Sequence, residues 1–281
     1  MTATAKHIVW VIRGNPVTGI AAAGFCFLLF LALFGPWIQP YDPIATNVDI
    51  ALQAPSAIHW AGTDQLGRDI LSRLIAAVRI DLAIAASAVA LSFVLGVGIG
   101  SAAGYIGGRV DRVIGSLVDV LMAFPLFVMA MAMVAVLGNR IENIVIATAF
   151  INLPFYIRFA RAEVNVRRDI GWVEAARACG DSHFNVILFS LIPNIMPAMA
   201  VQISLNLGWA ILNAAGLSFL GLGVTAPTPE WGIMVAEGAR FILSGQWWLV
   251  AFPGAALMLT VLCFNLLGDG LRDILDPRMR T

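Results

Sequence analysis

Charged residues are scarce in this sequence. They make up 12% of the 281 residues, whereas 60% are hydrophobic, and the mean hydropathy is +0.87. Soluble domains usually carry about a quarter charged residues. A soluble core of this length could not bury so much apolar surface, so we expect an integral membrane protein. The net charge of zero gives no sign of a nucleic-acid partner.

Side chains that perform chemistry are also few. The three cysteines include no C-x-x-C pair, which argues against a zinc or redox site. The three histidines lie outside the apolar runs, so a membrane serine protease built on Ser218 would lack its base. No paired carboxylates are expected within those runs. The only lysine, Lys6, follows no glycines, so the chain has no P-loop, and any ATP must bind to a separate polypeptide.

Long apolar runs, in contrast, are abundant. A membrane-spanning helix needs about 20 apolar residues, and six runs meet or approach that length. The expected spans are 17–38, 82–106, 113–137, 144–159, 197–222 and 248–267. The first run is too long for the apolar part of a signal peptide and no cleavage site follows it, so we expect it to be retained.

The basic residues predict how these spans are oriented. With the N-terminus inside, twelve of the seventeen Lys and Arg residues fall in inner segments and five in outer segments. Because inner loops are enriched in Lys and Arg, we expect both termini in the cytoplasm. The outer loops are then 39–81, 138–143 and 223–247, and the inner loops are 107–112 and 160–196.

The longest inner loop contains the stretch EAARACGD. We expect Asp169 to cap a short helix over 173–178 and Gly180 to form a left-handed turn at its end. Asp181 or Ser182 would then cap a second helix that enters the membrane. On spacing alone, an ordinary solvated loop with the same caps remains an equal alternative.

The same loop resembles a known motif. E-A-A, then Gly after three residues, then Pro thirteen residues later, resembles the EAA loop of ABC importer permeases. The matching residues are Glu174, Ala175, Ala176, Gly180 and Pro193. The family pattern has Leu before the proline and Ile two residues earlier, where this chain has Ile192 and Ser190.

Other segments resemble one branch of that family, the C-type permease subunit of dipeptide, oligopeptide and nickel importers. They are GTDQLGRDILSR at 62–73, DVLMAFP at 119–125, GLSFLGLG at 216–223 and GDGLRDILDPR at 268–278. The resemblance runs from about residue 15 to residue 278. Several motifs in the right order make it far more specific than one motif would be.

The resemblance implies an all-α inner-membrane protein with six transmembrane helices and the type I ABC importer permease fold. Residues 1–79 would hold the N-terminal tail, the first transmembrane helix and a periplasmic segment. Residues 80–272 would form the permease core, and residues 273–281 a cytoplasmic tail. The ATPase-coupling residues it implies are Glu174, Ala175, Ala176, Arg177, Gly180 and Asp181.

The implied partners are a second permease subunit in a heterodimer, two ATP-binding subunits, a periplasmic solute-binding protein and membrane lipid. This chain would not be an enzyme and would bind no cofactor, because ATP and Mg would be held by the ATP-binding subunits. The implied solute is a peptide or a peptide-like molecule. Nickel chelates, glutathione and opine-like compounds are the alternative.

Three polar residues are candidates for a translocation path. Asp119 is the only acid well inside an expected span, and Asn206 and Asn213 share one face of the fifth span. Intramembrane polar groups often face a hydrated interior. Two other interpretations stay open, an architectural ion pair for Asp119 and interhelical hydrogen bonds for the asparagines. A self-sufficient channel or secondary transporter would need more intramembrane carboxylates or repeated broken helices.

The outer loops carry two further features. The stretch 64–79 is amphipathic, and its apolar residues within 69–79 follow helical spacing, which predicts a helix lying along the outer surface before the second span. That helix would either help to dock a binding protein or act as a structural brace. Trp231, Trp247 and Trp248 in the last outer loop are typical of membrane-interface anchors.

Overall fold

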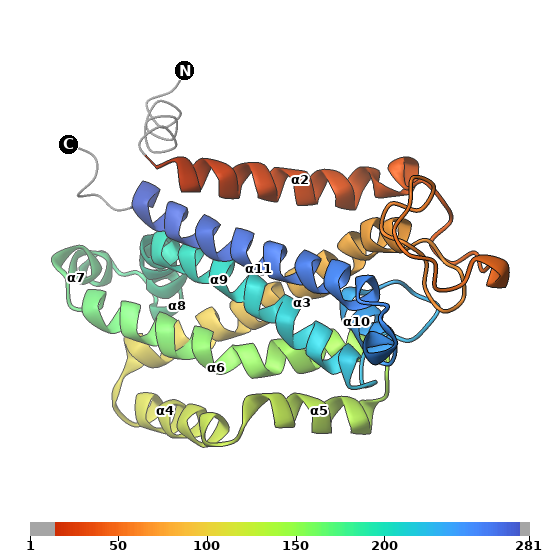
Figure 1. The fold of residues 1–281 in the computed structure, drawn as a ribbon. Helices are drawn as coiled ribbons and strands as arrows, with labels where there is room; N and C mark the ends of the chain where they lie inside the picture. Colours follow the sequence, from red (N-terminus) through yellow and green to blue (C-terminus); the bar gives the residue numbers. More distant parts are fainter. Residues whose placement is uncertain (1–14, 276–281) are drawn as a thin grey trace.

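The structure, a computed structural model, describes residues 15–275. Within this part of the chain, helices are the only regular structure apart from one isolated β-bridge between Thr63 and Asp69. The all-α fold class is therefore confirmed (Figure 1). The predictions for Lys6, Arg13 and most of the 273–281 tail concern residues outside the described part.

Five long helices make up most of the fold. They are α2 (Pro16–Ile38), α3 (Ile70–Ile106), α6 (Ile141–Arg167), α9 (Ile192–Phe219) and α11 (Trp248–Leu275). The shorter helices are α4 (Gly108–Ala123), α5 (Leu126–Leu137), α7 (Gly171–Ala178), α8 (His183–Asn185) and α10 (Trp231–Ala239). Two single turns, η1 (Val48–Ile50) and η3 (Ile242–Ser244), and a π-helical segment, η2 (Val186–Leu191), complete the described elements.

Five helical segments of the described part are long and apolar enough to cross a membrane. The third expected span, 113–137, is not one helix, because α4 and α5 meet at 85°. The break falls at Phe124 and Pro125. Proline lacks the N–H that would continue the helix and forces the preceding residue into an extended conformation, as Phe124 has here. The count is six only if this bent pair forms one span.

The expected helix before the second span is present from Ile70, but it is not a separate helix along the outer surface. Residues 64–69 form a loop, and α3 then runs for 37 residues from Ile70 without interruption. Asp69 caps its start by accepting a hydrogen bond from the Ser72 N–H. No proline follows, so the amphipathic stretch continues directly into the apolar run. At 1.5 Å per residue, α3 is about 55 Å long and exceeds the hydrocarbon thickness of a bilayer.

The expected inner loop 160–196 is also mostly helical. The helix α6 continues to Arg167, and the next long run begins at His183 and passes through Pro193. The π-helical segment η2 ends two residues before this proline, which cannot donate a hydrogen bond to the preceding turn. Only residues 168–182, including α7, remain as the connection.

The helices α3 and α6 pack unusually closely because α3 carries glycines at every fourth position of their contact. These glycines are Gly96, Gly100 and Gly104. A Cβ atom added to Gly100 would overlap the carbonyl oxygen of Ile157 on α6. Small residues at this spacing let two membrane helices approach each other's backbone. The sequence contains this pattern, and our sequence analysis did not use it.

The helices form an elongated bundle with two distinct ends (Figure 1). The helix α7, the first turn of α2 and the last turns of α11 lie at one end, called here the α7 end. A hydrogen bond of 3.5 Å joins Asn15 to Asp273 there. The segment 39–69 and α10 lie at the opposite end, called here the α10 end.

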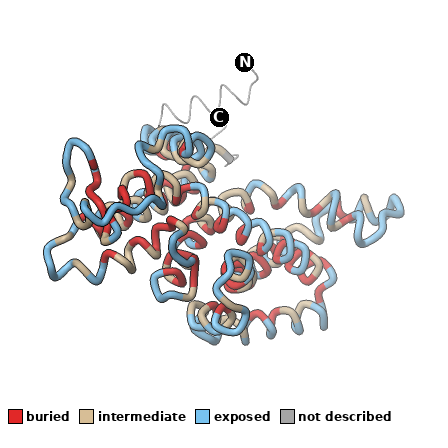
Figure 2. The backbone as a smooth tube through the Cα atoms, turned by 90° about the vertical axis from the view of Figure 1, so that its right-hand side faces the viewer, coloured by how far each residue is buried: buried red, intermediate tan, exposed pale blue. Residues whose placement is uncertain are grey.

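Burial follows this arrangement. Buried residues concentrate where helices face one another, and exposed residues cover the outer helices and the end loops (Figure 2). The exposed side chains of α2 include large apolar ones such as Ile20 and Phe27. In a membrane such side chains face lipid, which is as apolar as they are.

Candidate functional site

The helix α7 holds four of the six predicted coupling residues and projects at the edge of the α7 end (Figure 1). Val173 is its one fully buried residue and fixes it to the apolar core. Glu174, Ala175 and Arg177 are exposed, and Ala176 is half-buried. The helix is thus anchored along one line and presents the rest of its surface outward.

The start of α7 differs from the prediction. Ile170, not Asp169, is the residue before the first turn, and no side chain caps this end. The Asp169 carboxylate instead accepts a hydrogen bond from the neighbouring Arg168 Nε at 3.2 Å. Asp169 therefore lies outside the helix that it was expected to cap.

The end of α7 is built as the sequence predicts. Gly180 has a positive φ of +92°. Its N–H donates to the Arg177 carbonyl at 3.0 Å, and the Asp181 N–H donates to the Ala176 carbonyl at 3.1 Å. These two bonds form a Schellman motif, which fixes how the chain leaves a helix. Of the two expected caps for the next helix, Ser182 is used, since its side chain accepts from the Asn185 N–H.

A tyrosine that the sequence analysis did not single out links α7 to the body of the bundle. Tyr105, in the last turn of α3, is 6% exposed. Arg177 Nε donates to its hydroxyl at 3.0 Å, and His183 Nδ1 lies 3.1 Å from the same oxygen. The Arg177 guanidinium also lies 4.7 Å from the centre of the Tyr105 ring. Sequence spacing gave no signal for this contact.

The predicted path residue Asp119 lies on α4 rather than within a straight span. Its carboxylate pairs with Arg158 of α6 at 3.2 Å, and the two side chains are 67% and 59% exposed. This contact is an ion pair between neighbouring helices at the molecular surface.

The other two path candidates lie on α9. Asn206 is 5% exposed, and its Nδ2 has no hydrogen-bond partner among the described residues. The buried hydroxyl of Tyr156 on α6 is likewise unpartnered within that part of the chain. Asn213 is half-buried and donates to the Trp209 carbonyl of its own helix at 2.9 Å. The two asparagines therefore have different surroundings despite sharing a helix face.

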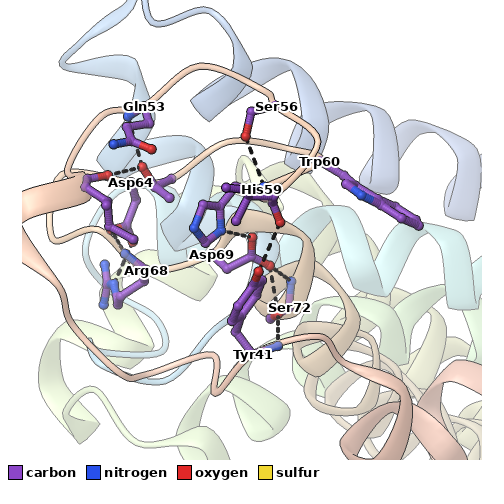
Figure 3. Close-up of polar contacts among 12 residues, drawn as sticks. Tyr41, Gln53, Ser56, His59, Trp60, Asp64, Arg68, Asp69 and Ser72 are labelled. Atoms are coloured by element: carbon purple, nitrogen blue, oxygen red, sulfur yellow. Dashed lines mark hydrogen bonds and ion pairs between the residues drawn. The ribbon is translucent and has the colours of Figure 1, made fainter.

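The α10 end contains a polar cluster around the start of α3 (Figure 3). The Asp69 carboxylate accepts from the Ser72 N–H at 2.8 Å and from the Ser72 hydroxyl at 2.7 Å. Its other oxygen lies 2.9 Å from His59 Nδ1. Ser72 Oγ in turn accepts from the Tyr41 N–H at 3.0 Å. These bonds fasten the loop after α2 to the first turn of α3.

A second cluster ties the same loop to α10. Arg68 and Arg73 are each 1% exposed, and both donate to the Glu237 carboxylate, at 3.1 and 3.2 Å. Asp64 accepts from Arg68 Nε at 2.6 Å, shown in Figure 3, and lies 3.6 Å from Arg73. Two carboxylates therefore balance two buried cations. This pairing offsets the free energy lost when the guanidinium groups are removed from water.

Two more carboxyl groups meet at the start of α10, outside the apolar runs in which no paired carboxylates are expected. Glu230 caps the helix by accepting from the Gly232 and Ile233 N–H groups, both at 2.8 Å. Asp81 of α3 accepts from the Trp231 N–H at 3.2 Å and lies within hydrogen-bonding reach of Glu230. Burial raises the pKa of the Glu230 carboxyl, although the two N–H bonds oppose the shift.

Family comparison identifies the chain. Residues 96–281 match the model of the binding-protein-dependent transport system inner membrane component. Residues 6–55 match the N-terminal transmembrane domain of oligopeptide transport permease C. The chain is an ABC importer permease. It belongs to the dipeptide, oligopeptide and nickel branch that its motifs resemble.

Individual relatives of the permease cover nearly its whole length. It is 43% identical to the di/tripeptide transport system permease protein of Pseudomonas aeruginosa, over 92% of this chain and 88% of the relative. It is 41% identical to a protein of Escherichia coli (strain K12) named "Probable D,D-dipeptide transport system permease protein", over 96% and 91%. The nickel transport system permease protein of the same strain is 42% identical, over 97% and 96%.

The family membership and the apolar helices agree on where the permease resides. Its relatives are inner-membrane components, and the described part contains at least five helices able to cross a bilayer. The permease is therefore a multi-pass protein of the inner membrane.

Proposed function

We propose that this permease is one membrane subunit of an ATP-driven importer for peptides or peptide-like solutes. It would receive the solute from a periplasmic binding protein and release it into the cytoplasm. Relatives named for dipeptides support the peptide class. The alternative is nickel chelates, glutathione or opine-like compounds, and relatives named for nickel and glutathione support its first two members.

The observation that carries the coupling proposal is the geometry of α7. A short helix that is anchored by Val173 and presents Glu174, Ala175 and Arg177 outward has the form of a docking element. The alanines permit close approach of a partner's backbone, and the two charged side chains offer hydrogen bonds. We assign α7, with Gly180 and Asp181 after it, as the segment that enters a groove on an ATP-binding subunit.

This assignment requires the α7 end to face the cytoplasm. The distribution of basic residues supports that orientation, with twelve of seventeen on the expected inner side. The first turn of α2 and the last turns of α11 lie at the same end, so both termini would be cytoplasmic. The bent pair α4 and α5 would then form the third of six spans.

The remaining subunits follow from this orientation. A second permease subunit would complete a heterodimer around the path, and two ATP-binding subunits holding ATP and Mg would dock at the α7 end. The binding protein would dock at the α10 end, over segment 39–69. Asp119, Asn206 and Asn213 remain proposed path residues, and the buried unpartnered amide of Asn206 gives that residue the best support.

Affinity capture of the tagged permease from mild detergent tests the proposal. We expect a second permease and an ATP-binding subunit to co-purify with ATPase activity, and Glu174→Lys to abolish that activity while leaving membrane insertion unchanged. A permease that purifies alone, hydrolyses no ATP and still moves solute in liposomes would overturn the proposal in favour of a channel or secondary transporter.

A further inference from the structure

The hydroxyl of Tyr105 lies between two separate segments of the α7 end. Arg177, on α7, donates to it, and His183, on α8, lies within hydrogen-bonding distance on the other side. Both of these partners are exposed, whereas Tyr105 itself is buried in the main apolar cluster of the bundle. One buried oxygen therefore connects the projecting helix, the segment after it and the last turn of α3.

Two further hydrogen bonds link α3 and α7 to the adjacent end of α6. Arg168 Nη1 donates to the carbonyl of Gly104 at 3.1 Å, one residue before Tyr105. Arg177 Nη2 donates to the carbonyl of Arg168 at 3.4 Å. Arg177 thus contacts the ends of both α3 and α6, and no other charged residue of α7 makes a hydrogen bond to the bundle within the described residues.

The two helices that receive these contacts are themselves locked together. Glycines of α3 pack directly on the backbone of α6, so a displacement of either helix end must carry the other. The covalent routes from α7, in contrast, pass through non-helical residues, 168–170 toward α6 and the turn at Gly180 toward the π-helical η2 and α9. A turn and an irregular helix absorb motion more readily than a packed helix pair does.

We propose that Tyr105 is a positioning residue for energy coupling, through which a movement of α7 is passed to the α3–α6 pair. This inference rests on the proposed docking of α7 to an ATP-binding subunit. A movement of α7 would pull on the Tyr105 hydroxyl through Arg177 and shift the end of α3. Without the hydroxyl, α7 could move while α3 stays behind, and ATP would be hydrolysed without import.

Tyr105→Phe is the direct test, because it removes the hydroxyl and keeps the buried ring. The Tyr105 hydroxyl makes two contacts, and the loss of both should change the population of the coupled arrangement about tenfold. We expect about a tenfold rise in ATP hydrolysed per solute imported, measured with the complete transporter in liposomes. Poor folding would lower hydrolysis and import together and leave this ratio unchanged.

Ser92→Ala is the matched control. It removes another buried hydroxyl from α3, one that donates only to carbonyls of its own helix, to Ala88 at 2.8 Å. We expect its ratio of ATP to solute to equal that of the unmodified protein. An equal rise in both variants would overturn the assignment to Tyr105.

His183→Ala keeps the test decisive if Tyr105→Phe does not assemble, because His183 is exposed. On its own it should raise the ratio by less than tenfold, because it removes one of the two contacts of the Tyr105 hydroxyl. Where Tyr105→Phe does assemble, adding His183→Ala should raise the ratio no further. An unchanged ratio in every variant would overturn the inference.

Chemical cross-linking separates this failure from a failure of the proposed function. Ala175→Cys should cross-link to the ATP-binding subunit with and without the Tyr105 hydroxyl. Cross-linking together with an unchanged ratio refutes only the role of Tyr105. Absence of any cross-link with Tyr105 intact refutes the docking of α7 itself.

Discussion

The two ends of the permease are held by different physical means. At the α10 end, the charged groups that fix the structure are buried, with Arg68 and Arg73 each 1% exposed and Glu230 also 1% exposed. At the α7 end, the polar groups that hold α7 are solvent-accessible, apart from the Tyr105 hydroxyl. The α10 end is therefore held by contacts that cost more to break than those at the α7 end.

This difference follows from the cost of separating charges. A buried cation that loses its carboxylate is left unpaired in a medium of low polarity, which costs several kcal/mol. An exposed arginine that leaves its partner is solvated by water, so its contact costs little to break. We infer that the ATP-binding subunit moves the α7 end, where contacts cost little free energy to break. The α10 end would keep its shape for the binding protein.

Removing one charge from the α10 end should have the largest effect on stability. Arg73→Ala leaves Glu237 and Asp64 with one buried cation instead of two, and we expect a loss of about 3–5 kcal/mol in the free energy of unfolding. Thermal unfolding in detergent measures it. Arg79→Ala is the control, since Arg79 is exposed on the same helix, and its effect should stay within about 0.5 kcal/mol. Equal losses of unfolding free energy in the two variants would contradict the proposed difference between the α10 end and the α7 end.

Disturbing the packing between α3 and α6 should have the next largest effect. Gly100→Val would force its side chain into the α6 backbone, at a cost of about 1–3 kcal/mol. The control is Gly98→Val on the same helix, where a Cβ atom meets nothing within 4 Å. We expect the Gly98 variant to unfold near the temperature of the unmodified permease. A Gly98 variant as unstable as the Gly100 variant would show that helix propensity, not contact, sets the cost.

A change at the turn after α7 should lower stability less than the two changes above. Its main effect should be on import. Gly180→Ala places a Cβ atom on a residue with φ of +92°, which costs about 1–2 kcal/mol locally. We expect normal membrane levels with import reduced severalfold, measured as uptake into liposomes at fixed ATP. Gly98→Ala, at an open position of α3 without a positive φ, should import normally. Full import by the Gly180 variant would mean that the angle of the turn is unimportant.

The smallest effect should come from proton binding at Glu230. Because burial raises its pKa in the folded protein, folding favours the protonated form. The associated stability is complete below the unfolded value of about 4.3 and is lost as pH rises through the higher folded value. We expect the unfolding temperature to fall over that range and Glu230→Gln to flatten the dependence. A slope that is the same in both proteins would exclude Glu230 as its source.

The sequence predicts the features that depend on local chemistry. The apolar runs of α2 and α11 and the turn at Gly180 were found because composition and a single residue decide them. The bend at Pro125 was not predicted but could have been, because a proline lies inside the expected third span. The start of α3 was misplaced because Asp69 was not recognised as a helix cap.

Features that depend on distant parts of the chain could not be predicted in this way. The pairing of Arg73 with Glu237 and of Asp81 with the start of α10 joins residues that only the folded bundle brings together. The contact of Tyr105 with Arg177 is of the same kind. A single sequence shows the charges and the tyrosine, but it does not show which helix ends will meet.

Cross-linking tests the central claim, the docking of α7 to an ATP-binding subunit, most directly. Ala175→Cys and Val166→Cys both place an exposed thiol near the α7 end, the first on α7 and the second on α6. Cys26, Cys179 and Cys263 would first be replaced by Ser. In the complete transporter we predict a cross-link to the ATP-binding subunit from position 175 that depends on nucleotide, and none from position 166. Equal cross-linking from both positions, or none from 175, would contradict the account.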